Sequence, residues 1–386
     1  MPRSVLLLPI LLACASLTVM AGATIAPGLP GLQAHFADQA NADYLSRFIL
    51  TAPGIAIAVS APVAGLFADK LGRRVLLQVG VALYIVAGTS GFWLDDLYTM
   101  LLSRLLLGVA VGIIMVCTTA LLTDHFQGAE RDKAMGVQSS AMAVGGIVFI
   151  AIGSVLAQVS WRSPFLVYLA PVVLLPLIYR YVTKPPASLQ VQGGENEKFP
   201  IGFACLIYAI GFVFMLLFYF VPTQVPFYIQ ELGENSPAYA GFAIVCSQIF
   251  GAIASAKFFW LRAKLGHRRI LLISGLCMAS GYLVLSQAQS IEMVYLGMPL
   301  IGTGLGFNFP NMSIWLMSRV PSTMRGRASG GLSTAIFLGL FLSPFLSQPM
   351  VNRLGQEGAF FMASLIMLVI IVVPVTVVLM RKPRPA

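Results

Sequence analysis

The sequence predicts an all-α membrane protein whose twelve transmembrane helices form two pseudo-symmetric six-helix bundles. Three observations predict this fold class: an apolar composition, basic residues concentrated in alternate loops, and an internal repeat. Of the 386 residues, 58% are hydrophobic and 10% are charged, whereas a soluble domain carries about 25% charged residues. So few charges cannot cover a water-facing surface of this size. Lipid must therefore be part of the solvent, and the length allows roughly twelve spans.

Apolar stretches long enough to cross a bilayer follow one another along the whole chain. Pro and Gly occur inside several of them, which membrane helices tolerate because neighbouring helices satisfy the freed backbone groups. Residues 184–200 have the composition of a linker, so we expect bundles at 1–183 and 201–386 with a cytoplasmic linker at 184–200. The predicted spans are 4–29, 46–68, 75–93, 97–123, 134–158, 163–183, 201–229, 238–260, 270–287, 290–318, 328–350 and 357–380.

The charges indicate how these spans are oriented. The formal net charge is +10, but the basic residues are scattered in short clusters and form no continuous face for nucleic acid. Twenty of them fall on one side of the predicted topology, and three, Arg47, Arg162 and Arg353, fall on the other. Basic loops stay in the cytoplasm. We therefore expect a multi-pass protein of the cell inner membrane with both termini in the cytoplasm.

The two halves match at a fixed offset of 194 residues. This match extends from the loop after the second span to the fifth and eleventh spans. It predicts two homologous bundles in parallel orientation, with a substrate site near the bilayer midplane between them and alternating access by rocking. The matching positions are Gly72 with Gly266, Gly108 with Gly302, Gly112 with Gly306, Arg131 with Arg325, and Gly145 with Gly339.

The loop between the second and third spans carries the most specific motif, Gly65-Leu66-Phe67-Ala68-Asp69-Lys70-Leu71-Gly72-Arg73-Arg74. It closely resembles the loop signature of the major facilitator superfamily. The resemblance implies a transporter with a conformational latch formed by Gly65, Asp69, Gly72, Arg73, Arg74 and Asp124.

Each latch residue has a physical role to test. Asp69 ends the second span, where it can meet a helix N-terminus, and Gly72 permits a sharp turn. Arg73 can pair with Asp124 at the end of the fourth span. The alternative is that Arg73 and Arg74 only set topology. In the second half Ala263 takes the place of Asp69.

The fourth span contains Arg104, followed by Gly108 and Gly112. This pattern resembles the fourth-span signature of drug and metabolite transporters in the superfamily. A charge inside a bilayer is costly, so Arg104 is a candidate for substrate binding or coupling. The alternative is that it only binds backbone carbonyls or extends to the outer face. Gly108, Gly112 and, in the fifth span, Gly145 are expected to permit close helix packing.

Paired prolines mark the ends of two spans. Pro27 and Pro30 end the first span, which is similar to the drug-efflux branch of the superfamily, and Pro222 and Pro226 lie in nearly the same place in the seventh. We expect these prolines to break the helices near an outer gate, although ordinary helix termination accounts for them equally well.

Two departures from the efflux branch bear on coupling. The fifth span has Gly145-Gly146 but lacks the proline of the usual antiporter signature, and all fourteen acidic residues fall in loops or at span ends. Both facts weigh against proton antiport, although Asp43 or Asp124 at a gate would still be able to carry a proton.

The function expected from these features is efflux, in the manner of multidrug resistance antiporters, of a small drug-like or anionic metabolite. Uptake of a small nutrient such as an organic acid is the alternative. His35, His125 and His267 lie in different loops, so no catalytic cluster is evident and we do not expect an enzyme. We expect no cofactor, no metal and no nucleic acid. The expected partners are the lipid bilayer, a small-molecule substrate and, for coupling, protons, and the chain is expected to be a monomer.

Overall fold

A computed structural model describes residues 3–182, 199–321, 324–373 and 375. Within these ranges the regular elements are helices, without any strand. The chain divides into two compact units, which we call unit 1 (Met1–Gln192 with Ser236–Gly241) and unit 2 (Gly193–Asn235 with Phe242–Ala386). Most of the predicted linker, namely its residues 184–198, lies outside the described residues.

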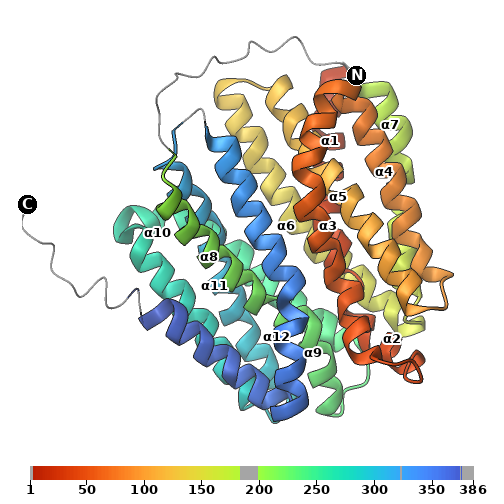
Figure 1. The fold of residues 1–386 in the computed structure, drawn as a ribbon, viewed down its shortest axis with the longest axis vertical. Coiled ribbons are helices and arrows are strands. Elements are labelled where there is room, and N and C mark those ends of the chain that lie inside the picture. The colour runs from red at the N-terminus through yellow and green to blue at the C-terminus, as the bar shows by residue number, and fades with distance from the viewer. Residues whose placement is uncertain (1–2, 183–198, 322–323, 374, 376–386) are drawn as a thin grey trace, which may run out of the picture. The chain divides into compact units, whose positions relative to one another are not determined.

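Unit 1 is built on a core of long helices that lie side by side (Figure 1). Within it, α3 and α4 both pack against α5, and α1 packs against α6. Its elements are α1 (Arg3–Ala23), η1 (Ala26–Gly28), α2 (Leu29–His35), α3 (Ala42–Leu71), α4 (Arg73–Thr89), η2 (Ser90–Phe92), α5 (Leu97–His125), α6 (Gly128–Val159), η3 (Ser163–Val173) and α7 (Leu174–Tyr181).

Unit 2 contains fewer but longer elements, with α8 packed against α11 and α12. Two of its helices bend at a glycine with positive φ: α10 at Gly266 (φ 72°) and α12 at Gly355 (φ 72°). Each therefore contains two straight segments. The elements are α8 (Ile201–Phe218), α9 (Phe220–Glu231), α10 (Pro237–Ser286), α11 (Ile291–Met317), α12 (Arg325–Met367) and a π-helical turn, η5 (Leu368–Val372).

The helices account for the predicted twelve spans. Nine segments of the described chain are long and apolar enough to cross a membrane, and two of these, 237–286 and 325–372, contain the glycine bends that divide them. The 27-residue helix α11 is also long enough, although its Gly, Asn, Ser and Thr residues lower its hydropathy. The prediction of an all-helical membrane fold is thereby confirmed.

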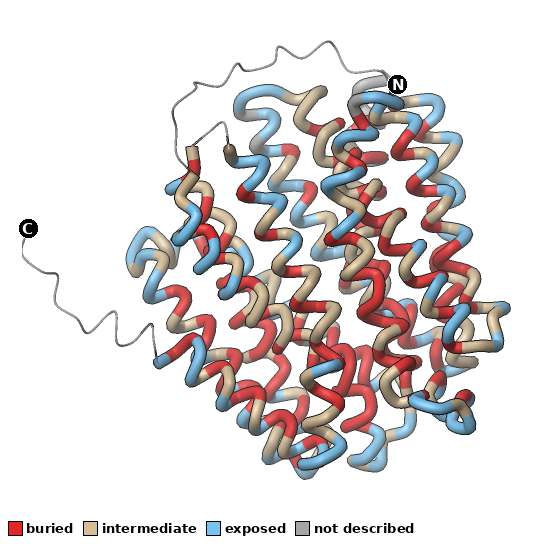
Figure 2. Tube along the Cα trace, viewed as in Figure 1, coloured by how far each residue is buried: buried red, intermediate tan, exposed pale blue. Residues whose placement is uncertain are grey.

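Exposed side chains are apolar along much of the helix surface. Val59, Leu102, Val155 and Leu296 are each at least 60% exposed within helices. Figure 2 shows exposed positions along the helices and not only in the loops. A water-facing protein rarely leaves so much apolar surface uncovered, and lipid is the solvent that suits it.

The structure differs from the predicted spans where helices are interrupted, and the first of these breaks is at the end of α1, which stops at Ala23 within the predicted span 4–29. The sixth span is not a continuous α-helix, because η3 is an eleven-residue 3₁₀-helix that precedes α7. The seventh span is divided at Tyr219, where α8 ends and α9 begins. Such local changes of helix type are not encoded in hydropathy, on which the predicted spans rest.

Candidate functional site

The turn between α3 and α4 places the predicted latch at one end of unit 1. Gly72 has φ 88°, a conformation that glycine adopts without steric cost, and α4 begins at the next residue. Arg73 forms an ion pair with Asp124 at the end of α5 and also donates a hydrogen bond to the carbonyl of Ala120 at 3.4 Å. The Asp124 side chain is only 9% exposed. This charge pair therefore ties the start of α4 to the end of α5.

The other latch residues do not all join this pair. Arg74 donates to the carbonyl of Tyr179 and lies 4.9 Å from the centre of the Tyr179 ring, so it fastens α4 to α7. Gly65 is half-buried in α3, with no atom within 4 Å of the place a Cβ would occupy. The side chain of Asp69 lies outside the described part of the structure.

Unit 2 has a different polar contact at the corresponding turn. His267 follows the bend at Gly266 as Arg73 follows Gly72, and its Nδ1 lies 2.8 Å from Asn311 Oδ1. Asn311 donates back to the His267 carbonyl at 3.1 Å, and the imidazole stacks on Trp315. The second half thus replaces an ion pair with an imidazole–amide pair.

Arg104 is completely buried in α5. Its Nη2 donates to the carbonyls of Ala87 and Gly88, at 2.6 and 2.8 Å, and its Nε lies 3.4 Å from Ser103 Oγ. These two carbonyls belong to the last turn of α4, where carbonyls have no partner within the helix and the helix dipole favours a cation. One side of the guanidinium therefore caps α4.

Two aromatic rings enclose the other faces of this guanidinium. Its Cζ lies 5.0 Å from the centre of the Phe165 ring and 5.4 Å from that of Tyr168. Both rings come from η3, in which residues three apart lie above one another. The 3₁₀ geometry therefore brings Phe165 and Tyr168 onto one face. The Tyr168 hydroxyl is held by its hydrogen bond to the Ala21 carbonyl, at 2.9 Å.

The Arg104 guanidinium keeps one unused donor. Nη1 is buried without a hydrogen-bond partner among the described residues, and the ion pairs found there include no carboxylate with Arg104. A buried donor without an acceptor is costly, and more so when it is charged. Nη1 is therefore the part of the guanidinium whose hydrogen-bonding capacity remains unused, while Nη2 caps α4.

The predicted packing glycines lie at close helix contacts. A Cβ on Gly108 would come within 2.8 Å of Pro53 Cα in α3, and one on Gly145 within 2.7 Å of Ser16 Cβ in α1. Gly112 faces Ser60 of α3 in the same way. These three residues lie in helix contacts and form no cavity.

The predicted gate prolines lie at helix breaks, with one exception. Pro27 is within η1, and Pro30 is in the first turn of α2, so the chain leaves α1 before both. Pro222 lies near the start of α9, just after the break at Tyr219. Pro226 lies inside α9 without ending it.

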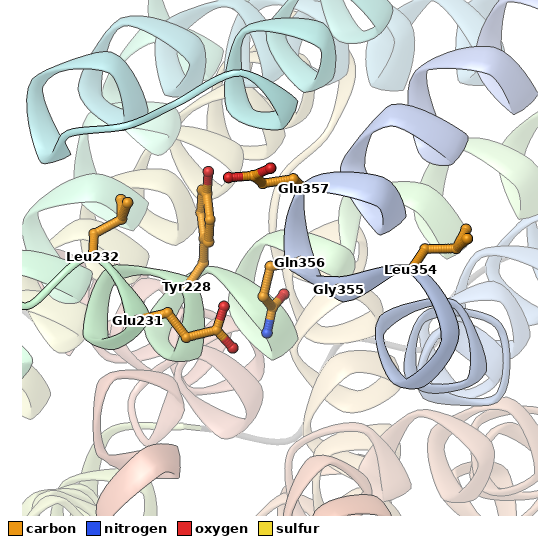
Figure 3. Close-up of a pocket in the computed structure, with 7 residues that line it drawn as sticks. All are labelled: Tyr228, Glu231, Leu232, Leu354, Gly355, Gln356 and Glu357. Atoms are coloured by element: carbon orange, nitrogen blue, oxygen red, sulfur yellow. The ribbon is translucent and has the colours of Figure 1, made fainter.

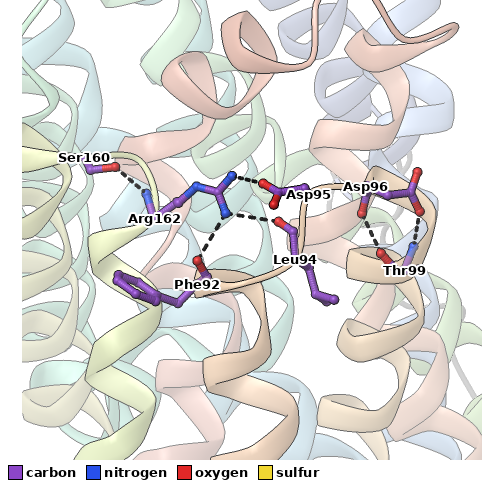
Figure 4. A network of polar contacts seen from close by, with 7 residues as sticks. All are labelled: Phe92, Leu94, Asp95, Asp96, Thr99, Ser160 and Arg162. Atoms are coloured by element: carbon purple, nitrogen blue, oxygen red, sulfur yellow. Dashed lines mark hydrogen bonds and ion pairs between the residues drawn. The ribbon is translucent and has the colours of Figure 1, made fainter.

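Sequence reasoning did not foresee a polar network at the other end of unit 1 (Figure 4). Arg162 pairs with Asp95 and donates to the carbonyls of Phe92 and Leu94, at 3.1 and 3.2 Å. Asp96 beside it caps α5 by accepting the Thr99 N–H at 2.8 Å. Only the Asp96 cap had a local signal, since Asp before an apolar helix is a common N-cap.

Comparison with known families identifies two overlapping matches. The model of the Major Facilitator Superfamily matches residues 11–256 and again 207–386. Together these segments cover nearly the whole chain, and they overlap at residues 207–256.

Curated relatives carry the name Multidrug resistance protein MdtG. The protein of Proteus mirabilis (strain HI4320) is 27% identical over 183 residues, 46% of this chain and 44% of that protein. The protein of Citrobacter koseri is 30% identical over 148 residues, 37% of this chain and 36% of that protein. These matches span less than half of the relatives' lengths.

Solved structures share the fold over almost the whole length. A bacterial homologue of the human lysosomal transporter Spinster, inward-facing and occupied, aligns over 100% of both chains with a TM-score of 0.79 and 15% identity. A D-xylose–proton symporter aligns over 93% of this chain and 96% of its own with a TM-score of 0.77 and 17% identity. At such identities the likeness concerns the fold alone.

Proposed function

The chain belongs to the Major Facilitator Superfamily, a family of membrane transporters and not of enzymes, and from this premise we propose secondary active export of a small drug-like or anionic metabolite by alternating access. The names of the MdtG relatives support export of drug-like compounds. In this proposal the bundles are residues 1–183 and 201–386, and 184–200 link them.

The free donor of Arg104 is the observation that carries the proposal. A guanidinium enclosed by Phe165 and Tyr168, with Nη1 unsatisfied, retains binding capacity for an anion. An anionic group in this low-dielectric site would gain more from the charge than it would in water. Arg104 therefore binds the anionic group of the substrate or transmits its arrival to α4.

The latch supports the conformational part of the proposal. Arg73 and Asp124 form a partly buried charge pair, and removing one partner leaves the other charge uncompensated in a partly dry site. Gly65, Asp69, Gly72 and Arg74 complete the loop that holds this end of unit 1. Breaking the pair with Arg73→Ala therefore shifts the balance between conformations and changes transport without touching Arg104.

The same proposal includes the transporter's location, its oligomeric state and the ion that drives it. The transporter lies in the cell inner membrane as a monomer, with both termini in the cytoplasm because the basic loops are there. Protons drive it as an antiporter, with an acid at a gate, such as Asp124 or Asp43, carrying the proton. Pro27, Pro30, Pro222 and Pro226 lie at the gate.

Uptake is the second candidate, because one structural relative is a D-xylose–proton symporter with the same fold. The two directions use the same architecture and differ only in which gradient is coupled. A small organic acid would then reach Arg104 from the outward-open conformation, whereas an exported compound would reach it from the inward-open one.

Counterflow in proteoliposomes tests the proposal. Purified protein is reconstituted and assayed with a panel of anionic, neutral and cationic compounds, with and without a pH gradient. We expect accumulation of at least one anionic or neutral drug-like compound. Its accumulation should be driven by protons that move down their gradient in the opposite direction. Accumulation only when protons and the compound move in the same direction supports uptake instead. No accumulation of any compound contradicts transport.

Variants separate the roles of the two arginines. Arg104→Ala is expected to abolish counterflow of the responding compound, and Arg73→Ala to change its rate while leaving equilibrium binding intact. Arg180→Ala, at a basic residue of the same predicted face outside both sites, is the matched control. Normal counterflow by Arg104→Ala contradicts a role for this residue in binding or coupling.

A further inference from the structure

A second polar site lies in unit 2, at the bend of α12. A cavity of about 300 Å³ opens where α9 ends and α12 bends, lined by Tyr228, Glu231, Leu232, Leu354, Gly355, Gln356 and Glu357 (Figure 3). The two carboxylates are exposed, whereas Tyr228 and Gln356 are 2% and 3% exposed. The cavity thus has an anionic rim and a buried polar floor.

The floor contains an acceptor without a donor. Gln356 Oε1 is buried and has no hydrogen-bond partner among the described residues. Figure 3 shows Gln356 among the side chains that line the cavity, with its amide nitrogen drawn nearer to Glu231 than its oxygen. A buried carbonyl oxygen of this kind costs free energy until a donor reaches it, and the Tyr228 hydroxyl does not supply that donor because it donates to the Ala288 carbonyl.

The fold does not require this cavity. In unit 1 the position equivalent to Gly355, 194 residues earlier, is Trp161. Its ring packs on His35 and Phe36, with centroid distances of 5.1 and 5.6 Å, and Arg162 lies over it. A bulky ring and a cation therefore stand in unit 1 where unit 2 has a glycine and an amide.

The lining decides the class of ligand. The cavity falls at the lower end of the volumes of small-molecule sites, and the side chains of Leu232 and Leu354 and the Tyr228 ring offer apolar contact. A metal ion would need six or more oxygens for Ca²⁺ or a tight octahedron for Mg²⁺, and no group of three or more His, Cys, Asp or Glu able to hold a metal occurs in the described residues. Two carboxylates, one orphan carbonyl and apolar walls suit an organic cation with N–H donors.

We propose that this cavity of unit 2 binds a small primary alkylammonium compound. The ammonium group donates to the orphan carbonyl of Gln356 and lies between the carboxylates of Glu231 and Glu357. The alkyl part packs on Leu232 and Leu354. The Tyr228 hydroxyl is fixed by its hydrogen bond to the Ala288 carbonyl, at 2.6 Å, so the floor is already formed before the ligand arrives.

Polar side chains continue from this floor into unit 2. Asn352 precedes Gln356 by four residues, and it accepts a hydrogen bond from Gln348 at 2.9 Å. Gln224 of α9 then donates to Gln348 at 3.3 Å and to Ser347 at 2.9 Å. These side chains hydrogen-bond to one another within unit 2 and do not line the cavity.

The test measures binding to the purified full chain in detergent, with radiolabelled n-butylamine as the probe at pH 7. We expect one site with a dissociation constant on the order of 0.1–1 mM. 1-Butanol, which is neutral, and tetramethylammonium, which has no N–H, should compete at least tenfold more weakly. Binding is measured without any gradient, so its outcome does not depend on the proposed direction of transport.

Variants locate the site. Glu231→Gln and Glu357→Gln should each weaken binding about three- to fivefold, as expected for solvent-accessible charge pairs. Gln356→Leu should weaken it about tenfold by removing the acceptor. Leu354→Trp, at a position 53% exposed, fills the mouth from outside and should abolish binding even if Gln356→Leu fails to fold.

Glu234→Gln is the matched control, because Glu234 lies three residues from Glu231 but does not line the cavity. It should leave binding unchanged. The proposal is overturned if n-butylamine does not bind up to 10 mM (about tenfold above the weakest expected constant), if Glu234→Gln weakens binding as much as Glu231→Gln, or if Ca²⁺ or Mg²⁺ displaces the probe at lower concentration than unlabelled n-butylamine.

Discussion

Units 1 and 2 carry different chemistry at positions 194 residues apart. Unit 1 has a buried guanidinium at Arg104, where unit 2 has the buried Met298. After its fifth span, unit 1 has Trp161 and Arg162, and Arg162 pairs with Asp95. At the equivalent positions unit 2 has Gly355 and Gln356, which line a cavity. The bends and close glycine contacts, in contrast, occur in both.

The comparison separates what the fold needs from what each half adds. Gly72 and Gly266 both have positive φ, and Gly108 and Gly302 both meet the backbone of a neighbouring helix within their unit. These shared features concern turns and helix packing. Charge and cavity differ between the units, so ligand binding is to be sought in the features that the two units do not share.

The largest effect is expected from Arg104→Met, which introduces the unit 2 residue into unit 1. Loss of a charged hydrogen-bond donor should reduce counterflow about tenfold to a hundredfold. Removal of the buried charge offsets part of the lost helix cap, so the thermal midpoint should change little. A large loss of thermal stability with normal counterflow per folded molecule would show a purely structural arginine.

Alanine at the shared packing glycines should come next. Gly108→Ala and Gly302→Ala each place a methyl group against backbone atoms of a neighbouring helix, of Pro53 and Ser247 respectively. Each should lower the free energy of unfolding by about 1–3 kcal/mol, measured by denaturation in mixed micelles. At the equivalent pair Gly136 and Gly330, no atom lies within 4 Å of the place that a Cβ would occupy, and there alanine should be neutral or slightly stabilising. Equal effects in the two pairs would refute the packing argument.

A smaller loss is expected from Arg162→Gln, which copies Gln356 into unit 1. It removes the pair with Asp95 and two hydrogen bonds to backbone carbonyls, and should cost about 1–2 kcal/mol. Asp95→Asn removes only the ion pair, whose carboxylate is 76% exposed, and should cost less in the same denaturation assay. The reverse order would mean that the carboxylate, and not the carbonyls, holds Arg162.

The smallest loss of stability is expected from removing a helix cap, and it should differ between the two units. Asp96 caps α5 through its side chain, whereas Ser290, its equivalent before α11, makes no side-chain cap hydrogen bond. Asp96→Ala should cost about 0.5–1 kcal/mol, and Ser290→Ala should be close to neutral. Comparable losses in thermal stability would show that Ser290 caps α11 in solution after all.

Hydropathy and repetition were sufficient to predict the overall fold. Apolar runs indicated the spans, and the 194-residue offset indicated the two homologous halves. The motif around Gly72 was informative because its glycines, its aspartate and its arginine pair stand together in one short loop between two apolar spans. The pairing of Arg73 with Asp124 was also foreseen as a candidate, because both residues end spans on the same predicted face.

The surroundings of Arg104 could not be predicted in this way. Phe165 and Tyr168 lie some sixty residues away in the sequence, and they face Arg104 together because η3 has three residues per turn. The cavity at Gly355 was equally hidden, since Glu231 belongs to α9 while Gln356 and Glu357 belong to α12, and Gln356 has no local pattern. Contacts between distant segments depend on helix rotation, which a single sequence does not specify.

The stretched form of η3 also affects how the sixth span fits a bilayer. Residues 163–181 number only 19, and an α-helix of that length would reach about 28 Å, slightly short of a hydrocarbon layer of about 30 Å. With eleven residues rising about 2 Å each, the same segment reaches about 34 Å. A short stretch of sequence can therefore hold Arg162 and Arg180 in opposite headgroup layers, without local thinning of the membrane around it.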